Sequence, residues 1–233
     1  MMTATRCTRI AVAALAAVVL SSMPALAGPW GPTGPADNFT YSNGQDINGC
    51  FGTPIVSGDT FYFLESNFQV NAANGTTDTK DDTVSVDLLA NQNMQFSSMQ
   101  VTAFGSYSLI GDGSQVNLNA GLTMHENAGL ERTWSGPLMT EPAFPIAFGG
   151  AVPNSGAWNG SALIDVTYVF PLPSDNIHVS LSNMVLAIAG PAGTAELNVQ
   201  YEDLAITFNL IPEPASLALL AVGAALLIRR RSW

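Results

Sequence analysis

Hydrophobic and polar residues alternate in runs of strand length along most of the chain between residues 60 and 210. A hydrophobic period of two residues predicts strands that bury one face and expose the other. The strands expected from this pattern are Thr60–Val70, Thr83–Ala90, Gln100–Ile110, Gln115–Met124, Ser161–Phe170, Ile177–Ala189 and Thr194–Leu210.

Short glycine-rich turns separate some of these runs. G-D-G-S at 111–114 and G-P-A-G at 190–193 each join two expected strands, and both predict hairpins. No part of the chain between residues 28 and 211 shows a sustained helical period with caps. We therefore expect an all-β domain, an antiparallel β-sandwich or jelly-roll-like fold, over residues 28–211.

Two stretches of this domain lack a clear period. Gly28–Pro54 is rich in Gly, Pro and Asn and predicts only short edge strands. Glu131–Gly160 reads as a long loop, which in a compact domain is either functional or wrongly assigned. Within it, Pro145–Phe148 is the best candidate for a short strand.

The N-terminus has the three ordered parts of a secretory signal peptide. Arg6 and Arg9 precede an apolar run, Ile10–Leu20, which is too short for a stable membrane anchor. Ala25 and Ala27 then form an A-x-A site. We expect signal peptidase to remove residues 1–27. The alternative, a buried N-terminal helix, does not account for this order.

The C-terminus carries a second hydrophobic segment. Pro212 and Pro214 end the last expected strand, and the apolar run Ala215–Ile228 would form a helix about 21 Å long. Arg229–Arg231 follow, and positive charge stays on the cytoplasmic side of a membrane. The pattern predicts one short transmembrane helix with its C-terminus in the cytoplasm and the β-domain outside.

This ending resembles the PEP-CTERM sorting signal. Pro212-Glu213-Pro214, the central Gly223 of the apolar helix and the arginines Arg229, Arg230 and Arg231 match its three parts in order over residues 212–233. The resemblance implies a Gram-negative bacterium that makes exopolysaccharide. It also implies that an exosortase cleaves the chain after a transient stay in the inner membrane. The domain would then reach the cell surface or the biofilm matrix. A permanent C-terminal anchor is the alternative.

The charge of the chain narrows its partners. The formal net charge is −11, and the only cations between residues 28 and 211 are Lys80 and Arg132. Such an acidic surface excludes nucleic-acid binding and disfavours anionic lipid. Cys7 leaves with the signal peptide, so Cys50 remains alone and the domain is not a disulfide scaffold.

Acidic residues offer one weak metal candidate. Asp78, Asp81 and Asp82 could bind Ca²⁺ through carboxylate oxygens, although their spacing is not that of an EF-hand. A solvated acidic turn is the simpler interpretation. We expect no metal and no cofactor.

Catalytic motifs are absent from the sequence. His125-Glu126 begins like a zinc-protease H-E-x-x-H, but Gly129 replaces the second histidine. A nucleophile–base pair of Cys50 with His125 or His178 is possible, but the sequence around these residues matches no signature of a cysteine-enzyme family. A glycosidase pair of Glu126 with Glu131 or Glu141 needs a separation that sequence does not give. We expect no catalytic activity, with a glycan hydrolase as a remote alternative.

Aromatic residues gather in the long loop, at Trp134, Phe144, Phe148 and Trp158. Such residues stack on sugar rings or cap one end of a sandwich. The expected function is that of a sorted surface or matrix protein. The alternative is a carbohydrate-binding module that holds the organism's own exopolysaccharide through Trp134 and Trp158.

Overall fold

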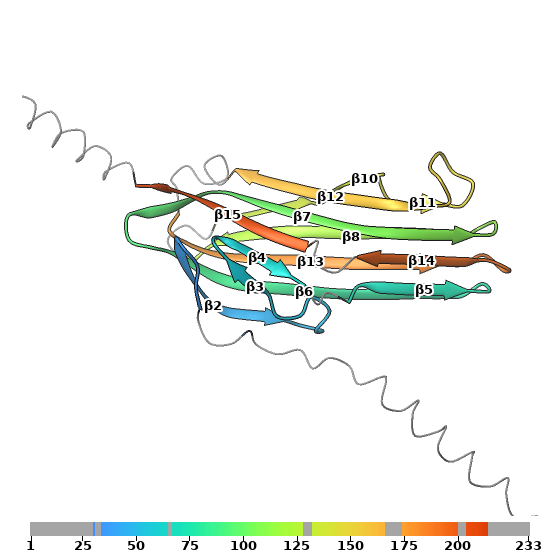
Figure 1. The fold of residues 1–233 in the computed structure, drawn as a ribbon, viewed down its shortest axis with the longest axis horizontal. Helices are drawn as coiled ribbons and strands as arrows, with labels where there is room; N and C mark the ends of the chain where they lie inside the picture. Colours follow the sequence, from blue (N-terminus) through green and yellow to red (C-terminus); the bar gives the residue numbers. More distant parts are fainter. Residues whose placement is uncertain are drawn as a thin grey trace, which may run out of the picture.

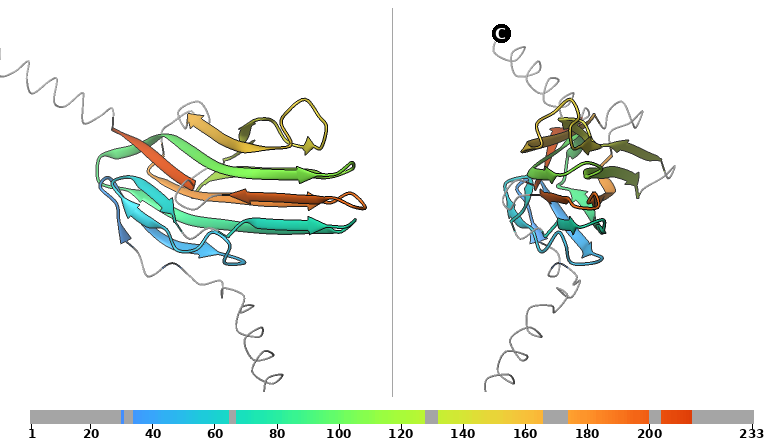
Figure 2. Two further views of the ribbon diagram at one scale, coloured as in Figure 1. Left: turned by 45° about the vertical axis from the view of Figure 1, so that its right-hand side comes forward. Right: turned by 90° about the vertical axis from the view of Figure 1, so that its right-hand side faces the viewer.

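The computed structural model describes residues 30, 34–64, 67–127, 132–165, 174–199 and 204–213. All regular secondary structure within these residues is β-strand, and every pair of neighbouring strands there is antiparallel. Two sheets lie face to face (Figures 1 and 2). The expected all-β antiparallel sandwich is confirmed.

Sheet 1 is centred on three long strands. In spatial order it contains β1 (Gly34–Pro35), β2 (Phe39–Asp46), β6 (Thr77–Ala90), β13 (Asn176–Ile188), β8 (Gln115–Glu126) and β11 (Ile146–Ala147), and β9 (Thr133–Pro137) also pairs with β8. The glycine- and proline-rich N-terminal stretch supplies the short edge strand β1, as predicted, but also β2, which is eight residues long and pairs with both β1 and β6.

Sheet 2 is built around β7. In spatial order it contains β10 (Met139–Glu141), β12 (Ser155–Asp165), β7 (Met94–Ile110), β15 (Leu204–Pro212), β4 (Thr60–Phe63) and β3 (Ile55–Ser57), and β14 (Thr194–Val199) lies between β7 and β5 (Gln69–Ala73). Both β14 and β15 pair with β7, one after the other along its length. The two long strands expected over residues 60–70 and 194–210 are therefore each divided in two.

The region 131–160 was wrongly assigned as a loop. It contains β9, β10, β11 and the first part of β12, and the expected short strand around residue 146 is β11. The polar run at 77–82 was also misread. It is not a turn but the first half of β6, because it pairs along β13 from Thr77 to Asp82.

Both predicted hairpins are wrong. The turn 111–114 joins β7 of sheet 2 to β8 of sheet 1, and the turn 190–193 joins β13 of sheet 1 to β14 of sheet 2. The turn 74–76 crosses in the same way between β5 and β6. These three turns are arches between the sheets, and they lie together at one end of the sandwich (Figure 1). A tight turn between two alternating runs does not reveal whether the strands pair edge to edge or face each other.

Backbone contacts hold the three arches together. The N–H of Gly75 donates to the carbonyl of Gly190 at 2.8 Å, and the N–H of Gly190 donates to Oγ of Ser114 at 3.0 Å. A Cβ on Gly190 would collide with the carbonyl oxygen of Asp112. Glycine is therefore required at 190 by the close approach of two backbones.

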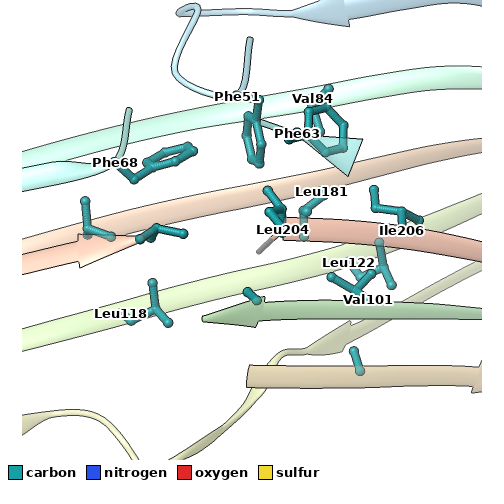
Figure 3. Close-up of a cluster of buried hydrophobic side chains, with 14 of the residues drawn as sticks. Phe51, Phe63, Phe68, Val84, Val101, Leu118, Leu122, Leu181, Leu204 and Ile206 are labelled. Carbon is teal, nitrogen blue, oxygen red and sulfur yellow. The ribbon is translucent and has the colours of Figure 1, made fainter. Parts of the chain in front are cut away.

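The core lies between the sheets. Figure 3 shows side chains from both layers pointing toward one another, and all of them are buried. Sheet 1 supplies Val84, Leu118, Leu122 and Leu181, and sheet 2 supplies Phe63, Val101, Leu204 and Ile206. Each fully buried side chain of this kind contributes about 1.5–3 kcal/mol of hydrophobic stabilisation.

Aromatic rings fill one end of this core. Phe39 and Phe61 pack edge to face with centroids 5.8 Å apart, and Phe208 contacts both rings at 5.4 and 5.7 Å. Trp30 packs against Phe61 at 5.7 Å. These contacts tie the N-terminal residues to the last strand, β15.

Candidate functional site

The C-terminal junction lies at the end of sheet 2. The last residue of β15, Pro212, pairs with Met94 of β7. The backbone N–H of Glu213 then donates to the carbonyl of Asn93 at 2.9 Å. The first two residues of the Pro-Glu-Pro sequence are thus attached to the domain, and Pro212 is exposed there.

Several predicted functional residues lie outside the described part of the chain. These are Ala25, Ala27, Pro214, Gly223, Glu131 and the arginines Arg229, Arg230 and Arg231. No helix of the described residues is long and apolar enough to cross a membrane, and Ala215–Ile228 is not among those residues.

The three aspartates proposed for Ca²⁺ do not converge. The side chain of Asp82 is buried on the inner face of β6, whereas that of Asp81 points to the outer face and is exposed. Asp78 accepts a hydrogen bond from the backbone N–H of Asn71 at 2.8 Å. Nowhere in the described ranges do three or more His, Cys, Asp or Glu side chains form a group that could hold a metal.

Asp82 instead forms a buried pair with Asp46, which the sequence did not single out. The pair fixes the loop 47–52 that follows β2. Backbone N–H groups of Asn48 and Cys50 donate to Asp82 at 2.7 and 2.6 Å, and those of Gly49 and Gly52 donate to Asp46 at 3.2 and 2.7 Å. Because amide donors surround both carboxyl groups, the pair is arranged to order a loop rather than to bind a cation.

The two carboxyl groups differ in their affinity for a proton. Burial, followed by the hydrogen bond to Asp82, raises the pKa of Asp46 to about 7. Burial also acts to raise the pKa of Asp82, but hydrogen bonds from Asp46 and from backbone N–H groups outweigh it and lower that pKa. Below about pH 7, Asp46 therefore carries the proton, and its O–H donates a hydrogen bond to the ionised Asp82.

Cys50 lies in the same loop and is buried. Burial raises the pKa of its thiol to about 11, which keeps it protonated and unreactive. His125 and His178 project from the outer face of sheet 1, between buried neighbours on β8 and β13. The structure does not bring Cys50 to either histidine, so the Cys-His hypothesis is wrong.

The aromatic residues of region 131–160 do not form an exposed platform. Trp158 is only 2% exposed, and its indole N–H donates to the carbonyl of Asn198 at 3.3 Å. Phe144 packs edge to face on Trp158, with centroids 5.7 Å apart. Trp134 is half-buried against the core. The assignment of Trp158 as a glycan contact is therefore wrong, because the ring is part of the core.

The acidic candidates for hydrolysis are also separated. Glu126 is buried and forms an ion pair with Arg132 at 2.8 Å, in which the guanidinium also donates through Nε. Glu141 lies on β10, at the far edge of sheet 2. The structure does not bring Glu126 and Glu141 together as a carboxyl pair.

One hydrogen-bonded row crosses the outer face of sheet 1. Register pairs Asp87 of β6 with His178 of β13, His178 with His125 of β8, and His125 with Thr133 of β9. Nδ1 of His178 lies 2.7 Å from Oδ1 of Asp87, and Nδ1 of His125 lies 2.9 Å from Oγ1 of Thr133. These residues are far apart in sequence and lie side by side only because of the register of the strands. The sequence alone does not give that register, so it did not reveal the row.

Asp87 anchors this row. Burial acts to raise its pKa, but hydrogen bonds from Asn43, His178 and Asn127 outweigh that effect and lower the pKa. Asn43 reaches Asp87 at 2.7 Å from the bulge of β2, where its backbone has a positive φ of 54°. The carboxylate of Asp87 is therefore ionised at neutral pH, and three hydrogen-bond donors fix its orientation.

Comparison with known proteins identifies the end of the chain. Residues 210–232 match the family model of the PEP-CTERM protein-sorting motif. This match confirms the resemblance expected from residues 212–233. No curated protein matches the chain.

Similar solved structures share little with this chain. A structure of the infectious bursal disease virus Gx strain is 10% identical, with a TM-score of 0.24, over 64% of this chain and 43% of that one. TmCBM61 in complex with β-1,4-galactotriose is 12% identical, with a TM-score of 0.21, over 82% and 100%. Winged bean acidic lectin with methyl-α-D-galactose is 11% identical, with a TM-score of 0.25, over 65% and 98%. The chain spans less than half of the viral protein, and TM-scores this low carry no functional argument.

Proposed function

We propose that this chain, whose last residues carry a PEP-CTERM protein-sorting motif, is an exported surface protein that an exosortase cleaves and releases. The motif at 210–232 carries the proposal. It implies an exported, membrane-associated surface protein with an exosortase as its processing partner. Its first three residues, 210–212, are the end of β15, so cleavage after them would free the complete sandwich.

The proposal includes an orientation. Signal peptidase removes residues 1–27, the domain lies outside the inner membrane, and Arg229–Arg231 remain in the cytoplasm. The charge pattern supports this arrangement, because clustered arginines are retained on the cytoplasmic side. After cleavage the acidic domain has no anchor, and its charge keeps it soluble in an exopolysaccharide matrix.

We also propose that the domain has no catalytic activity of its own. The contacts of its buried acids support this. Glu126 pairs with Arg132, and Asp46 and Asp82 accept backbone N–H groups of the loop that they hold. None of these groups is poised for proton transfer to a substrate.

The intact mass of the protein from native cells tests the proposal. We expect an extracellular species that begins at Gly28 and ends close to Pro212. Deleting the exosortase should leave a membrane species that still ends at Trp233. A membrane species that retains Trp233 in wild-type cells would show that the tail is a permanent anchor and would overturn the proposal.

A substitution in the motif provides a matched test within the chain. Glu213→Gln removes the only charge of Pro-Glu-Pro while conserving its size, and should reduce release. Glu141→Gln, on an exposed strand of the same sheet, is the control and should leave release unchanged. Equal release of both variants would argue against recognition of the motif.

A further inference from the structure

The only two histidines of the chain lie side by side. They are separated by more than fifty positions in sequence, yet the register of β13 and β8 makes His178 and His125 direct cross-strand partners. Both are flanked by buried residues on their strands, so both side chains stand on the outer face of sheet 1. Directly opposed side chains of an antiparallel pair have Cβ atoms about 4.5–5.5 Å apart.

Hydrogen bonds fix the orientation of each ring. The Nδ1 of His178 is held by Asp87 on one side of the pair, and the Nδ1 of His125 is held by Thr133 on the other side. Nδ1 and Nε2 lie on opposite edges of an imidazole ring. Because the two Nδ1 atoms are anchored outward, the two Nε2 edges are directed inward, toward each other across the β13–β8 pair.

The hydrogen bond to Asp87 selects, in neutral His178, the tautomer that binds metals, and the hydroxyl of Thr133, which can donate or accept, is compatible with the same tautomer of His125. A carboxylate only accepts hydrogen bonds, so Asp87 requires the proton of neutral His178 to reside on Nδ1. That leaves the Nε2 lone pair free. A histidine whose Nδ1–H donates to a carboxylate is the usual arrangement of a metal ligand, because the partner fixes the ring and raises its basicity.

From this geometry we infer that Nε2 of His125 and Nε2 of His178 together bind one divalent transition-metal ion, of the Zn²⁺, Ni²⁺ or Cu²⁺ class. Imidazole nitrogen suits these ions, whereas Ca²⁺ and Mg²⁺ prefer oxygen ligands. Since no third protein ligand joins the pair among the described residues, water or an outside ligand completes the coordination. Asp87 and Thr133 act as positioning residues.

The site is open to solvent. The side chain of His178 is 38% exposed and that of Asp87 is 27% exposed. Asn43 and Asn127 also donate to Asp87, at 2.7 and 3.3 Å, and these bonds hold the carboxylate in place to direct His178 rather than to move toward the ion. An ion can therefore enter without any displacement of the core.

Calorimetric titration of the full-length protein with Zn²⁺ tests the inference. The protein is purified in detergent with an affinity tag that contains no histidine, and excess Ca²⁺ occupies the surface carboxylates. We expect one Zn²⁺ per chain. We expect His125→Gln and His178→Gln each to abolish this binding, because a single imidazole does not chelate.

Two further variants distinguish the orientation of His178 by Asp87 from general effects of a substitution on this face of the sheet. Ser180→Gln lies two residues from His178 on the same face of β13 and should bind Zn²⁺ like the wild type. Asp87→Asn should bind about 10-fold more weakly, as expected when the partner of a ligating histidine is lost. Unchanged thermal melting of the histidine variants checks that they fold.

The outcomes are decisive in either direction. No Zn²⁺ binding by the wild type, or equal binding by the wild type and both histidine variants, would overturn the site. Wild-type affinity in Asp87→Asn would overturn the positioning role of Asp87. None of these results bears on exosortase processing, which depends on the C-terminal motif.

Discussion

Protonated Asp46 donates a hydrogen bond to Asp82 beneath the loop 47–52, and each carboxyl group also accepts hydrogen bonds from backbone N–H groups of that loop. Two buried acids thereby order a segment that has no regular structure. The arrangement requires a proton on Asp46, whose pKa is raised to about 7. Alkaline conditions therefore place two negative charges in contact.

This pair makes stability depend on pH. Because the pKa of Asp46 is higher in the folded state, the folded state binds more protons than the unfolded state between about pH 4 and pH 7. The free energy of unfolding should therefore fall as pH rises through this range, by on the order of 2 kcal/mol. Urea unfolding of the protein without its terminal segments, measured at several pH values, checks this.

Two substitutions test the assignment to Asp46. Asp46→Asn removes the titrating group, so it should remove the fall in stability with pH, although its NH2 group replaces one of the two oxygens that accept the N–H groups of Gly49 and Gly52 and should lower stability at all pH values. Asp112→Asn, in an exposed turn, is the control and should keep the wild-type pH profile. An unchanged profile in Asp46→Asn would show that another group is responsible.

Trp158 should contribute to stability rather than to sugar binding. Trp158→Ala removes a buried ring that packs on Phe144 and lies against Gly105, and should cost about 3–5 kcal/mol of unfolding free energy. Trp134→Ala removes a half-buried ring and should cost less. Urea unfolding measures both. If Trp158→Ala keeps full stability but loses retardation in exopolysaccharide gels, our placement of this ring in the core is wrong.

The crossing of the arches requires glycine at 190. Gly190→Ala would place a methyl group on the carbonyl of Asp112 and should cost more than 2 kcal/mol, roughly the range of overpacked sites. Gly149→Ala provides the comparison, because Gly149 has a positive φ of 72° but open space around it. Its cost should be about 1–2 kcal/mol, from backbone strain alone. Equal unfolding free energies for the two variants would contradict the steric explanation.

The junction at Glu213 should limit processing. A protease needs an extended, detached substrate, but Glu213 is bonded to Asn93 and Pro212 is paired with Met94. A short Gly-Ser linker inserted after Ile211 should therefore increase the rate of release. Pulse-chase labelling measures this rate, and the same linker inserted after the exposed Gly149 is the control. Slower release with the junction linker would indicate that the attached geometry is itself recognised.

The strands were largely predictable because alternation reports burial directly. The strands β8 and β13 follow the expected runs within two residues at each end, and β7 ends as expected at Ile110 but begins six residues earlier, at Met94. The pairing was not predictable, because a glycine turn suits a hairpin and an arch equally well. Because strand pairing could not be predicted, the histidine site on the outer face of sheet 1 could not be predicted either. Asp87, His178 and His125 each fit a strand pattern, but only the register places them in one row.

The candidate residues show where local reading fails. Asp78 and Asp82 share one face of a strand and Asp81 takes the other, so a strand at 77–82 excludes the calcium cluster that a turn would have allowed. Trp158 is the first buried residue of β12, whose first three residues, 155–157, are all exposed, and the surrounding Gly and Pro residues concealed this strand. The sorting motif was predictable in full, since it depends on linear order rather than on folding.

The last strand of the domain is an interior strand of its sheet. β15 lies between β7 and β4, and its last three residues, 210–212, are also the first three of the sorting motif. Because β15 is the last strand of the domain in the chain, it is the last to leave a translocation channel. Until then the position between β7 and β4 in sheet 2 is empty. In the export route that we propose, maturation would therefore be ordered in time, because the sandwich closes only when the segment that an exosortase would read has also left the channel.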